Sequence, residues 1–130
     1  MKVVDASVVI KALLDEPRRE EAKALLEEGA GLVVPDILFV EVANALATKA
    51  IVSEEGIREG LDFVYNMGFE VKETTREILE ESAGMAKRKG TAVYDMLYAV
   101  LAKKLKTELV TADENFLKTT GFSWARVLGE

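Results

Sequence analysis

Four acidic residues lie where a carboxylate is hard to explain by folding alone. Each one follows or interrupts a run of apolar residues, so each is expected to be at least partly buried. A lone buried carboxylate costs several kcal/mol, roughly, unless it is paired or bound to a metal. No basic residue stands next to any of them in the sequence. The four residues are Asp5, Glu41, Asp95 and Asp113.

The composition restricts what such an acidic cluster can do. The chain contains no Cys and no His, so thiolate and imidazole ligands are excluded, as are hydrolases of the Ser-His-Asp and Cys-His types. A metal site made only of oxygen ligands favours Mg²⁺ or Mn²⁺ over Zn²⁺. Clustered carboxylates that hold these ions are a common means of hydrolysing phosphodiester bonds. The sequence therefore predicts a metal site with this chemistry.

Short apolar runs alternate with helical patterns along the chain. Strands are predicted over residues 2–4, 32–34, 69–71, 107–111 and 125–128. Helices are predicted over residues 7–14, 18–28, 36–50, 53–67, 74–89, 93–104 and 114–118. This alternation predicts an α/β fold, a three-layer sandwich with a mainly parallel central sheet of about five strands, in a single domain over residues 1–130.

The predicted fold can bring the four acids together if the strands that precede Asp5 and Asp113 are neighbours. In open parallel sheets, ligands bind beyond the carboxyl ends of the strands. Asp5 and Asp113 each end a predicted strand, and Glu41 and Asp95 lie near helix starts at the same edge. Each acid also has a simpler explanation: Asp5 and Asp113 could be helix N-caps, and Glu41 could lie on a solvated stripe. Asp95 is the hardest to explain without a shared site, because its helix is apolar on nearly every side.

Four polar residues are candidates to support these acids. Ser7 and Thr111 each stand two residues from an acid, where a hydroxyl could orient a carboxylate. Helix capping by Ser7 and strand propensity of Thr111 are equally good explanations. Asn44 follows one helical turn after the second acid and could hold the site or touch substrate. Asn115 could complete the shell around the last acid or merely begin a helix.

The charge of the chain is uneven. The net charge of −6 argues against a general nucleic-acid coat protein. Residues 85–106, however, contain six basic residues and one acid. Lys87, Arg88 and Lys89 could contact RNA phosphates, although cations are also routine at the C-terminus of a helix. Tyr94 and Tyr98 are expected in the core.

Nothing in the sequence predicts a membrane segment. The start of the chain does not resemble a signal peptide, because Asp5 falls where the apolar region should be. The most apolar long stretch, residues 37–52, carries Glu41 and Lys49 and is too short to span a bilayer. We therefore expect a soluble cytoplasmic protein with no membrane partner.

Four segments, each containing one of the acids, resemble in order the motifs of the PIN-domain ribonucleases, specifically the VapC toxins of toxin–antitoxin pairs. They are residues 4–11, 35–46, 94–102 and 109–116. Any one of these motifs is weakly specific, whereas four in order at normal spacing are specific. One departure is Asn115, where many relatives have another Asp. The chain therefore offers four carboxylates rather than five, which leaves the number of bound metal ions open.

The resemblance implies a PIN-like fold and an endoribonuclease that depends on Mg²⁺ or Mn²⁺. It implies that the four acids bind the metal and that an activated water attacks the phosphorus of RNA. It also implies a homodimer and a VapB-like antitoxin that covers the site. One alternative is a PIN-like module that binds RNA or protein without turnover, against which the intact acid set argues. Another is a phosphatase with Asp5 as nucleophile, but Ser7 stands where such enzymes usually have a second acid.

Overall fold

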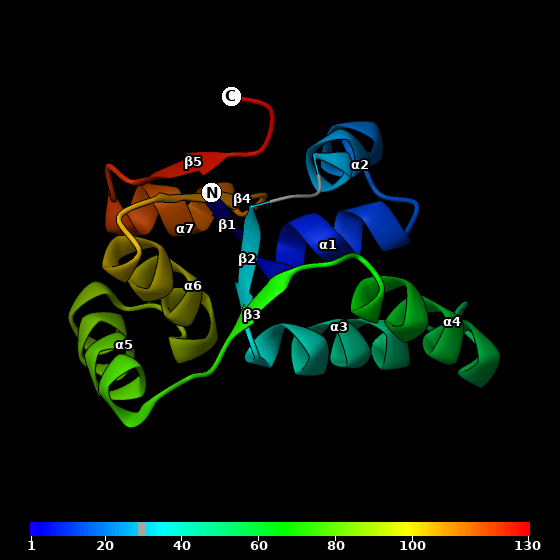
Figure 1. Cartoon of the computed structure of the whole chain (residues 1–130), viewed down its shortest axis with the longest axis horizontal. Coiled ribbons are helices and arrows are strands. Elements are labelled where there is room, and N and C mark those ends of the chain that lie inside the picture. The colour runs from blue at the N-terminus through cyan, green and yellow to red at the C-terminus, as the bar shows by residue number, and fades with distance from the viewer. Residues whose placement is uncertain (29–30) are drawn as a thin grey trace.

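The computed structural model describes residues 1–28 and 31–130 of the chain, and within them it contains five strands and seven helices (Figure 1). The strands are β1 (Lys2–Val4), β2 (Leu32–Pro35), β3 (Glu70–Lys72), β4 (Glu108–Thr111) and β5 (Ala125–Val127). The helices are α1 (Ala6–Leu13), α2 (Arg19–Glu27), α3 (Ile37–Thr48), α4 (Glu54–Tyr65), α5 (Arg76–Lys89), α6 (Val93–Lys104) and α7 (Glu114–Thr120).

The strands form one sheet in the order β3-β2-β1-β4-β5, and every neighbouring pair is parallel. The central strands β1 and β4 pair with Val3 opposite Leu109 and Val4 opposite Val110. All four of these side chains are buried. Continuous burial is typical of parallel strands covered on both faces. The predicted fold is confirmed, with a sheet that is parallel throughout.

Helices cover both faces of the sheet. In Figure 1, α1 and α2 lie on one side and α6 and α7 on the other. Helix α6 packs against β1, β2 and β4, and α5 packs on the outside of α6. Helix α3 contacts both α1 and α4, so the α3–α4 pair is joined to the body of the molecule. Within the described residues, no helix is both long enough and apolar enough to cross a membrane.

The strand order creates a switch point between β1 and β4. From β1 the chain moves to β2 and β3 on one side, and then returns to place β4 on the other side of β1. Connections leave the two neighbouring strands in opposite directions, which opens a crevice beyond their carboxyl ends. Asp5 follows β1 directly, and Asp113 lies two residues after β4. The two strands that precede Asp5 and Asp113 are therefore neighbours, which is the condition under which both carboxylates reach the same crevice.

Candidate functional site

Asp5 is the most deeply buried of the four acids, with 8% of its surface exposed. It is also the N-cap of α1, because its Oδ1 accepts a hydrogen bond of 3.4 Å from the backbone N–H of Val8. Ser7, for which helix capping was an alternative, lies inside α1 instead. Asp5 therefore has the local role that its position allows, but a cap does not require such deep burial.

Two hydroxyl groups hold the Asp5 carboxylate. Ser7 Oγ donates to Asp5 Oδ1, and Thr111 Oγ1 donates to Asp5 Oδ2. The hydroxyls are fixed in turn by backbone N–H groups, because Ala112 N donates to Ser7 Oγ at 2.9 Å and Asp113 N donates to Thr111 Oγ1 at 3.0 Å. The network ties the end of β4 to the start of α1. The structure thus places Ser7 and Thr111 where the sequence suggested they could act.

Burial raises the pKa of Asp5 from 3.8 to about 6. The hydrogen bonds from Ser7, Thr111 and Val8 act in the opposite direction, and the negative charge of Asp95 raises the pKa further. No cation compensates this buried carboxyl among the described residues. A strongly perturbed carboxyl in a crevice is typical of a functional site.

Glu41 projects from α3 and is half-buried. Its Oε1 accepts a hydrogen bond of 2.7 Å from the hydroxyl group of Tyr98, which belongs to α6 and is 1% exposed. Burial raises the pKa of Glu41, the Tyr98 hydrogen bond lowers it, and the charge of Asp95 raises it. The bond joins two elements on either side of the crevice and fixes one carboxylate oxygen, which leaves the other oxygen of Glu41 free to bind a ligand.

Asp95 and Asp113 complete the group. Asp95 lies in the first turn of α6, and Asp113 is the N-cap of α7, accepting a 3.1 Å hydrogen bond from Phe116 N. The pKa of Asp95 is raised by burial and then by the negative charge of Asp113. Asp95 therefore interacts electrostatically with all three other acids, which shows that the four carboxylates share one region. Among the described residues, none of the four forms an ion pair.

The four acids do not form a closed metal cage in the described structure. Within residues 1–28 and 31–130, no three acidic side chains are close enough to hold a metal ion between them. The donor chemistry nevertheless fits Mg²⁺ or Mn²⁺, since the carboxylate donors are oxygens and, in the part of the chain that the structure describes, no basic side chain forms an ion pair with them. Glu41, Asp95 and Asp113 are only partly buried, so their carboxylates are accessible from the crevice.

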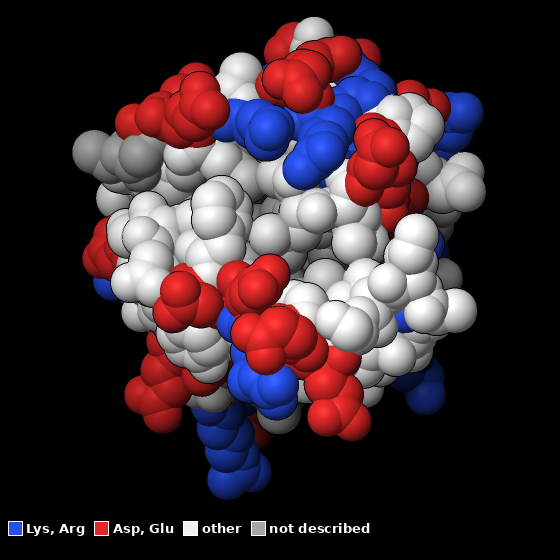
Figure 2. Space-filling model, turned by 90° about the vertical axis from the view of Figure 1, so that its right-hand side faces the viewer, with Lys and Arg blue, Asp and Glu red and all other residues white. Residues whose placement is uncertain are grey.

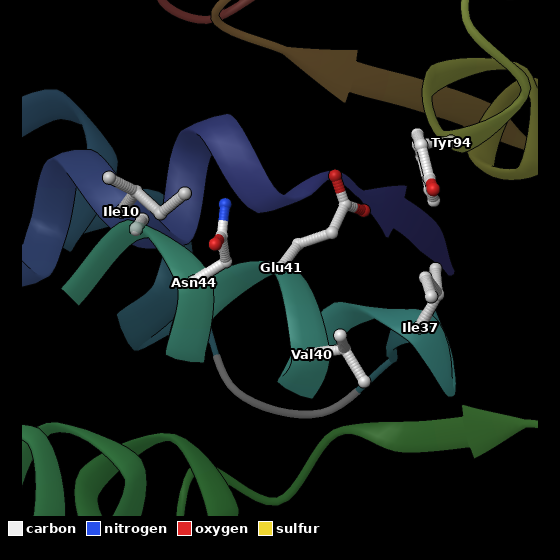
Figure 3. A pocket seen from close by; sticks show the side chains of 7 residues that line it. Ile10, Ile37, Val40, Glu41, Asn44 and Tyr94 are labelled. Atoms are coloured by element: carbon white, nitrogen blue, oxygen red, sulfur yellow. The ribbon is translucent and has the colours of Figure 1, made fainter. Parts of the chain in front are cut away.

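A pocket of about 540 Å³ opens beside Glu41 (Figure 3). In Figure 3, Glu41 and Asn44 point from α3 into the space below α1, and Tyr94 stands across from them on α6. Tyr94 is 59% exposed, so its predicted core location is wrong. The remaining walls are aliphatic. They are formed by Ile10, Ile37, Val40 and Ala45.

The other predicted site residues are less closely tied to the acids. Asn44 faces the pocket, and Asn115 is exposed on α7; within the described residues, neither side chain forms a hydrogen bond. Lys87, Arg88 and Lys89 form the exposed last turn of α5. The hydrogen bond from Tyr98 to Glu41 was not predicted from the sequence. Its position three residues after Asp95 places both on the same helix face, which is the signal that could have revealed it.

Comparison with known proteins agrees with this geometry. A family model described as PIN domain matches residues 2–121. The chain belongs to the PIN-domain family. Ribonuclease VapC3 from Pyrobaculum aerophilum is 30% identical to this PIN domain over 115 residues, which cover 85% of this chain and 88% of that protein. The resemblance read from the sequence, including its VapC type, is therefore confirmed, and the matched residues include all four acids.

Two solved structures show the same fold. The crystal structure of PAE2754 from Pyrobaculum aerophilum has a TM-score of 0.75 and 25% identity to this PIN domain, covering 98% of this chain and 90% of that one. A toxin–antitoxin complex from Klebsiella pneumoniae contains a chain with a TM-score of 0.75 and 18% identity, covering 100% of this chain and 99% of that one. At 18% identity, the second similarity shows the fold alone.

Proposed function

We propose that this PIN domain is a metal-dependent endoribonuclease and the toxin of a VapBC-type toxin–antitoxin pair. The observation that carries the proposal is the group of four carboxylates, without a basic partner among the described residues, at the switch point of the sheet. A structural role for so many uncompensated acids is unfavourable, because like charges in a partly buried site destabilise the fold. A ligand with positive charge removes this cost.

The proposed ligand is Mg²⁺ or Mn²⁺, with Asp5, Glu41, Asp95 and Asp113 as the residues that would hold it. When bound, such an ion supplies Lewis acidity and positive charge for phosphodiester hydrolysis. Asp5 is the fixed member of the set, because two hydroxyl groups and one backbone N–H hold its carboxylate. Fixed ligands reduce the entropy lost when a site assembles, so the geometry at Asp5 would define the position of the ion.

The partly exposed acids have different proposed roles. Glu41 is held on one oxygen by Tyr98 and presents the other to the crevice. The charge of Asp95 acts on Asp5 and Glu41, and the charge of Asp113 acts on Asp95. A substitution at Asp95 should therefore alter the electrostatics of all four carboxylates. The carboxylates also repel RNA phosphates until their charge is neutralised. Cleavage should therefore require the cation for substrate approach as well as for the reaction.

The proposed antitoxin site lies on the face that carries α2 and α4. Figure 2 shows an uncharged, hollowed band on this face, with basic and acidic side chains mixed along its upper edge and mostly acidic ones along its lower edge. A cavity in this region is lined by Ala12, Leu26, Phe63 and Met67 together with the stems of Lys23 and Glu27. Its chemistry fits a VapB-like segment whose apolar side chains are flanked by charged ones. The change Phe63→Glu should weaken such a complex, as measured by co-purification with the product of the neighbouring gene.

A homodimer is the second proposed assembly. Exposed Val40, Leu79 and Tyr94 line two adjoining pockets that share Ile37 and Tyr94 and whose walls are mainly apolar. Apolar surface of this kind is typical of protein interfaces. The change Leu79→Glu places a charge in this surface and should shift the sedimentation of the protein toward the monomer. An unchanged oligomeric state would assign the surface to another use.

The central experiment compares Asp95→Asn with Asp15→Asn. Both changes remove one carboxylate, but Asp15 is exposed beyond the end of α1, away from the crevice. With Mn²⁺ present, Asp95→Asn should lower the rate of single-stranded RNA cleavage by orders of magnitude, while Asp15→Asn should cleave like the parent. Circular dichroism checks that both variants are folded. If Asp95→Asn cleaves RNA at the parental rate, the proposed site is wrong.

A further inference from the structure

An aromatic pair gathers basic residues that are separated in the sequence. The rings of Phe122 and Trp124 stack with their centroids 4.3 Å apart and an interplanar angle of 17°. Lys89 Nζ lies 5.9 Å from the centroid of Phe122, and Lys103 Nζ lies 5.7 Å from the centroid of Trp124. The end of α5 and the end of α6 therefore present their cations on one surface, which the chain order alone does not show.

The aromatic pair is anchored to the body of the protein. Trp124 Nε1 donates a 2.9 Å hydrogen bond to the carbonyl oxygen of Ala99 in α6. Phe122 packs edge-on against Phe116 of α7, with centroids 6.1 Å apart. A cation above an aromatic face is attracted by the ring quadrupole, and the lysine stems cover the rings. The ammonium groups are thus held at defined places on a rigid support.

The positive charge on this surface is not neutralised. Three basic side chains lie at this aromatic pair: Lys89 and Lys103 above its rings, and Lys106, which lines a surface pocket together with Lys103 and Trp124. Among the residues that the structure describes, none of the three forms an ion pair, whereas neighbouring Lys104 contacts both Glu77 and Glu81. All three are exposed, in a chain whose net charge is −6. We call them, with Phe122 and Trp124, the basic–aromatic surface.

The basic–aromatic surface begins close to the four acids and extends away from them. Phe116 lies about one helical turn after Asp113, and Phe122 packs against Phe116 with the ring centroids 6.1 Å apart. Along α6, Lys103 follows Asp95 by eight residues, which corresponds to about 12 Å at 1.5 Å per residue. An extended strand with one phosphate at the acids can therefore place a further phosphate near Lys103.

We propose that the basic–aromatic surface binds the phosphate backbone of single-stranded RNA next to the point of cleavage. The proposal rests on the proposed ribonuclease function and extends it with a second contact for the same substrate. RNA is favoured because its phosphates carry the charge that this surface lacks, and each phosphate neutralised by a lysine releases counterions. The surface would hold RNA against the repulsion of the neighbouring carboxylates. Helix dipoles also favour cations at these helix ends, but they do not explain why the two ends share one support.

The test removes two charges from the surface and, as a control, two charges elsewhere. The test variant is Lys89→Gln with Lys103→Gln. The control is Lys49→Gln with Lys72→Gln, which lowers the net charge equally at the end of α3 and on β3. Both are made together with Asp95→Asn, so that RNA stays intact. Fluorescence anisotropy then measures binding of RNA oligonucleotides about 4 and about 16 nucleotides long, within the range of known single-strand site sizes.

The test variant should bind the long RNA roughly tenfold more weakly than the protein that carries Asp95→Asn alone. The slope of log K against log salt concentration should become smaller in magnitude by about 1.4, since each lost contact to a single strand contributes about 0.7. Binding of the short RNA should weaken as well, because the distance of about 12 Å along α6 between Asp95 and Lys103 lies within the reach of an extended strand of about four nucleotides. The control variant should match the affinity and the salt dependence of the protein that carries Asp95→Asn alone. Equal affinities and slopes for the test variant and the control would overturn the proposal. A changed oligomeric state of the test variant at unchanged RNA affinity would also overturn it, because the surface would then be a protein interface.

The same measurements separate this proposal from the proposed function. In one outcome, the unmodified protein does not cleave RNA with Mn²⁺, but long-RNA binding weakens when Lys89 and Lys103 are changed. The basic–aromatic surface is then supported and the nuclease assignment fails. If the parent cleaves RNA and the two lysines do not affect binding, the nuclease assignment stands and the surface is not an RNA site.

Discussion

The free energy of unfolding should rise when Asp5 is replaced by Asn in the absence of metal. The pKa of Asp5 is raised from 3.8 to about 6 because the carboxyl is buried. This change of roughly 2 pKa units corresponds to about 3 kcal/mol at 1.36 kcal/mol per unit. The native state binds the proton more tightly than the unfolded state. The stability that the protonated Asp5 carboxyl contributes to the native state is therefore fully present below pH 3.8, and it is lost as the pH rises through about 6.

The variant Asp5→Asn keeps the shape of the side chain and removes the charge. Ser7 and Thr111 can still bond to it, since a hydroxyl group can either donate or accept. In EDTA at pH 8, the variant should be more stable than the parent by up to about 3 kcal/mol. The difference should shrink toward zero near pH 4, where the parental carboxyl is protonated. Glu41 and Asp95 also have raised pKa values, but they titrate in both proteins and largely cancel in the difference.

Urea unfolding from pH 4 to pH 8 in EDTA measures this difference directly, with Asp15→Asn as the control for a lost surface charge. The control should stay within about 0.5 kcal/mol of the parent at every pH. Addition of Mn²⁺ should reverse the order, because only the parent retains the buried carboxylate to bind it. A difference between Asp5→Asn and the parent that does not depend on pH, or a loss of stability at pH 8, would refute the reasoning.

Three further predictions concern the ion and the residues that hold the acids. Mn²⁺ or Mg²⁺ at about 100 times its dissociation constant should raise the free energy of unfolding by about 2.7 kcal/mol, and a melting curve unchanged at millimolar metal would contradict the site. Tyr98→Phe removes the hydrogen bond to Glu41, which is worth about 1.5–3 kcal/mol when the acceptor is charged. It should weaken Mn²⁺ binding in calorimetry, whereas Tyr65→Phe on the surface should not; equal affinities would show that the bond is only structural. Thr111→Val removes a hydrogen-bond donor that lowers the pKa of Asp5, so the acidic limb of the pH–rate profile should move to higher pH. If the limb does not move, it reports the titration of another group.

The sequence by itself determined the chemistry of the candidate site and the class of the fold. The absence of His and Cys left only oxygen ligands, which is a property of composition and needs no coordinates. Residues 3–4 and 109–110 are apolar without alternation, which predicts strands buried on both faces because such strands have no solvated side. The positions of Asp5 and Asp113 after these strands then followed from chain order.

The tertiary structure decided which side chains meet. The Tyr98–Glu41 bond joins residues 57 positions apart, and the Thr111–Asp5 bond joins residues 106 positions apart. Such contacts depend on strand order and helix rotation, which periodicity does not specify. For the same reason Tyr94 was expected in the core but is exposed. The packing of Trp124 against α6 brings Lys89 and Lys103 onto one surface. Sequence patterns report local burial and local caps, whereas distances between elements arise only when the core packs.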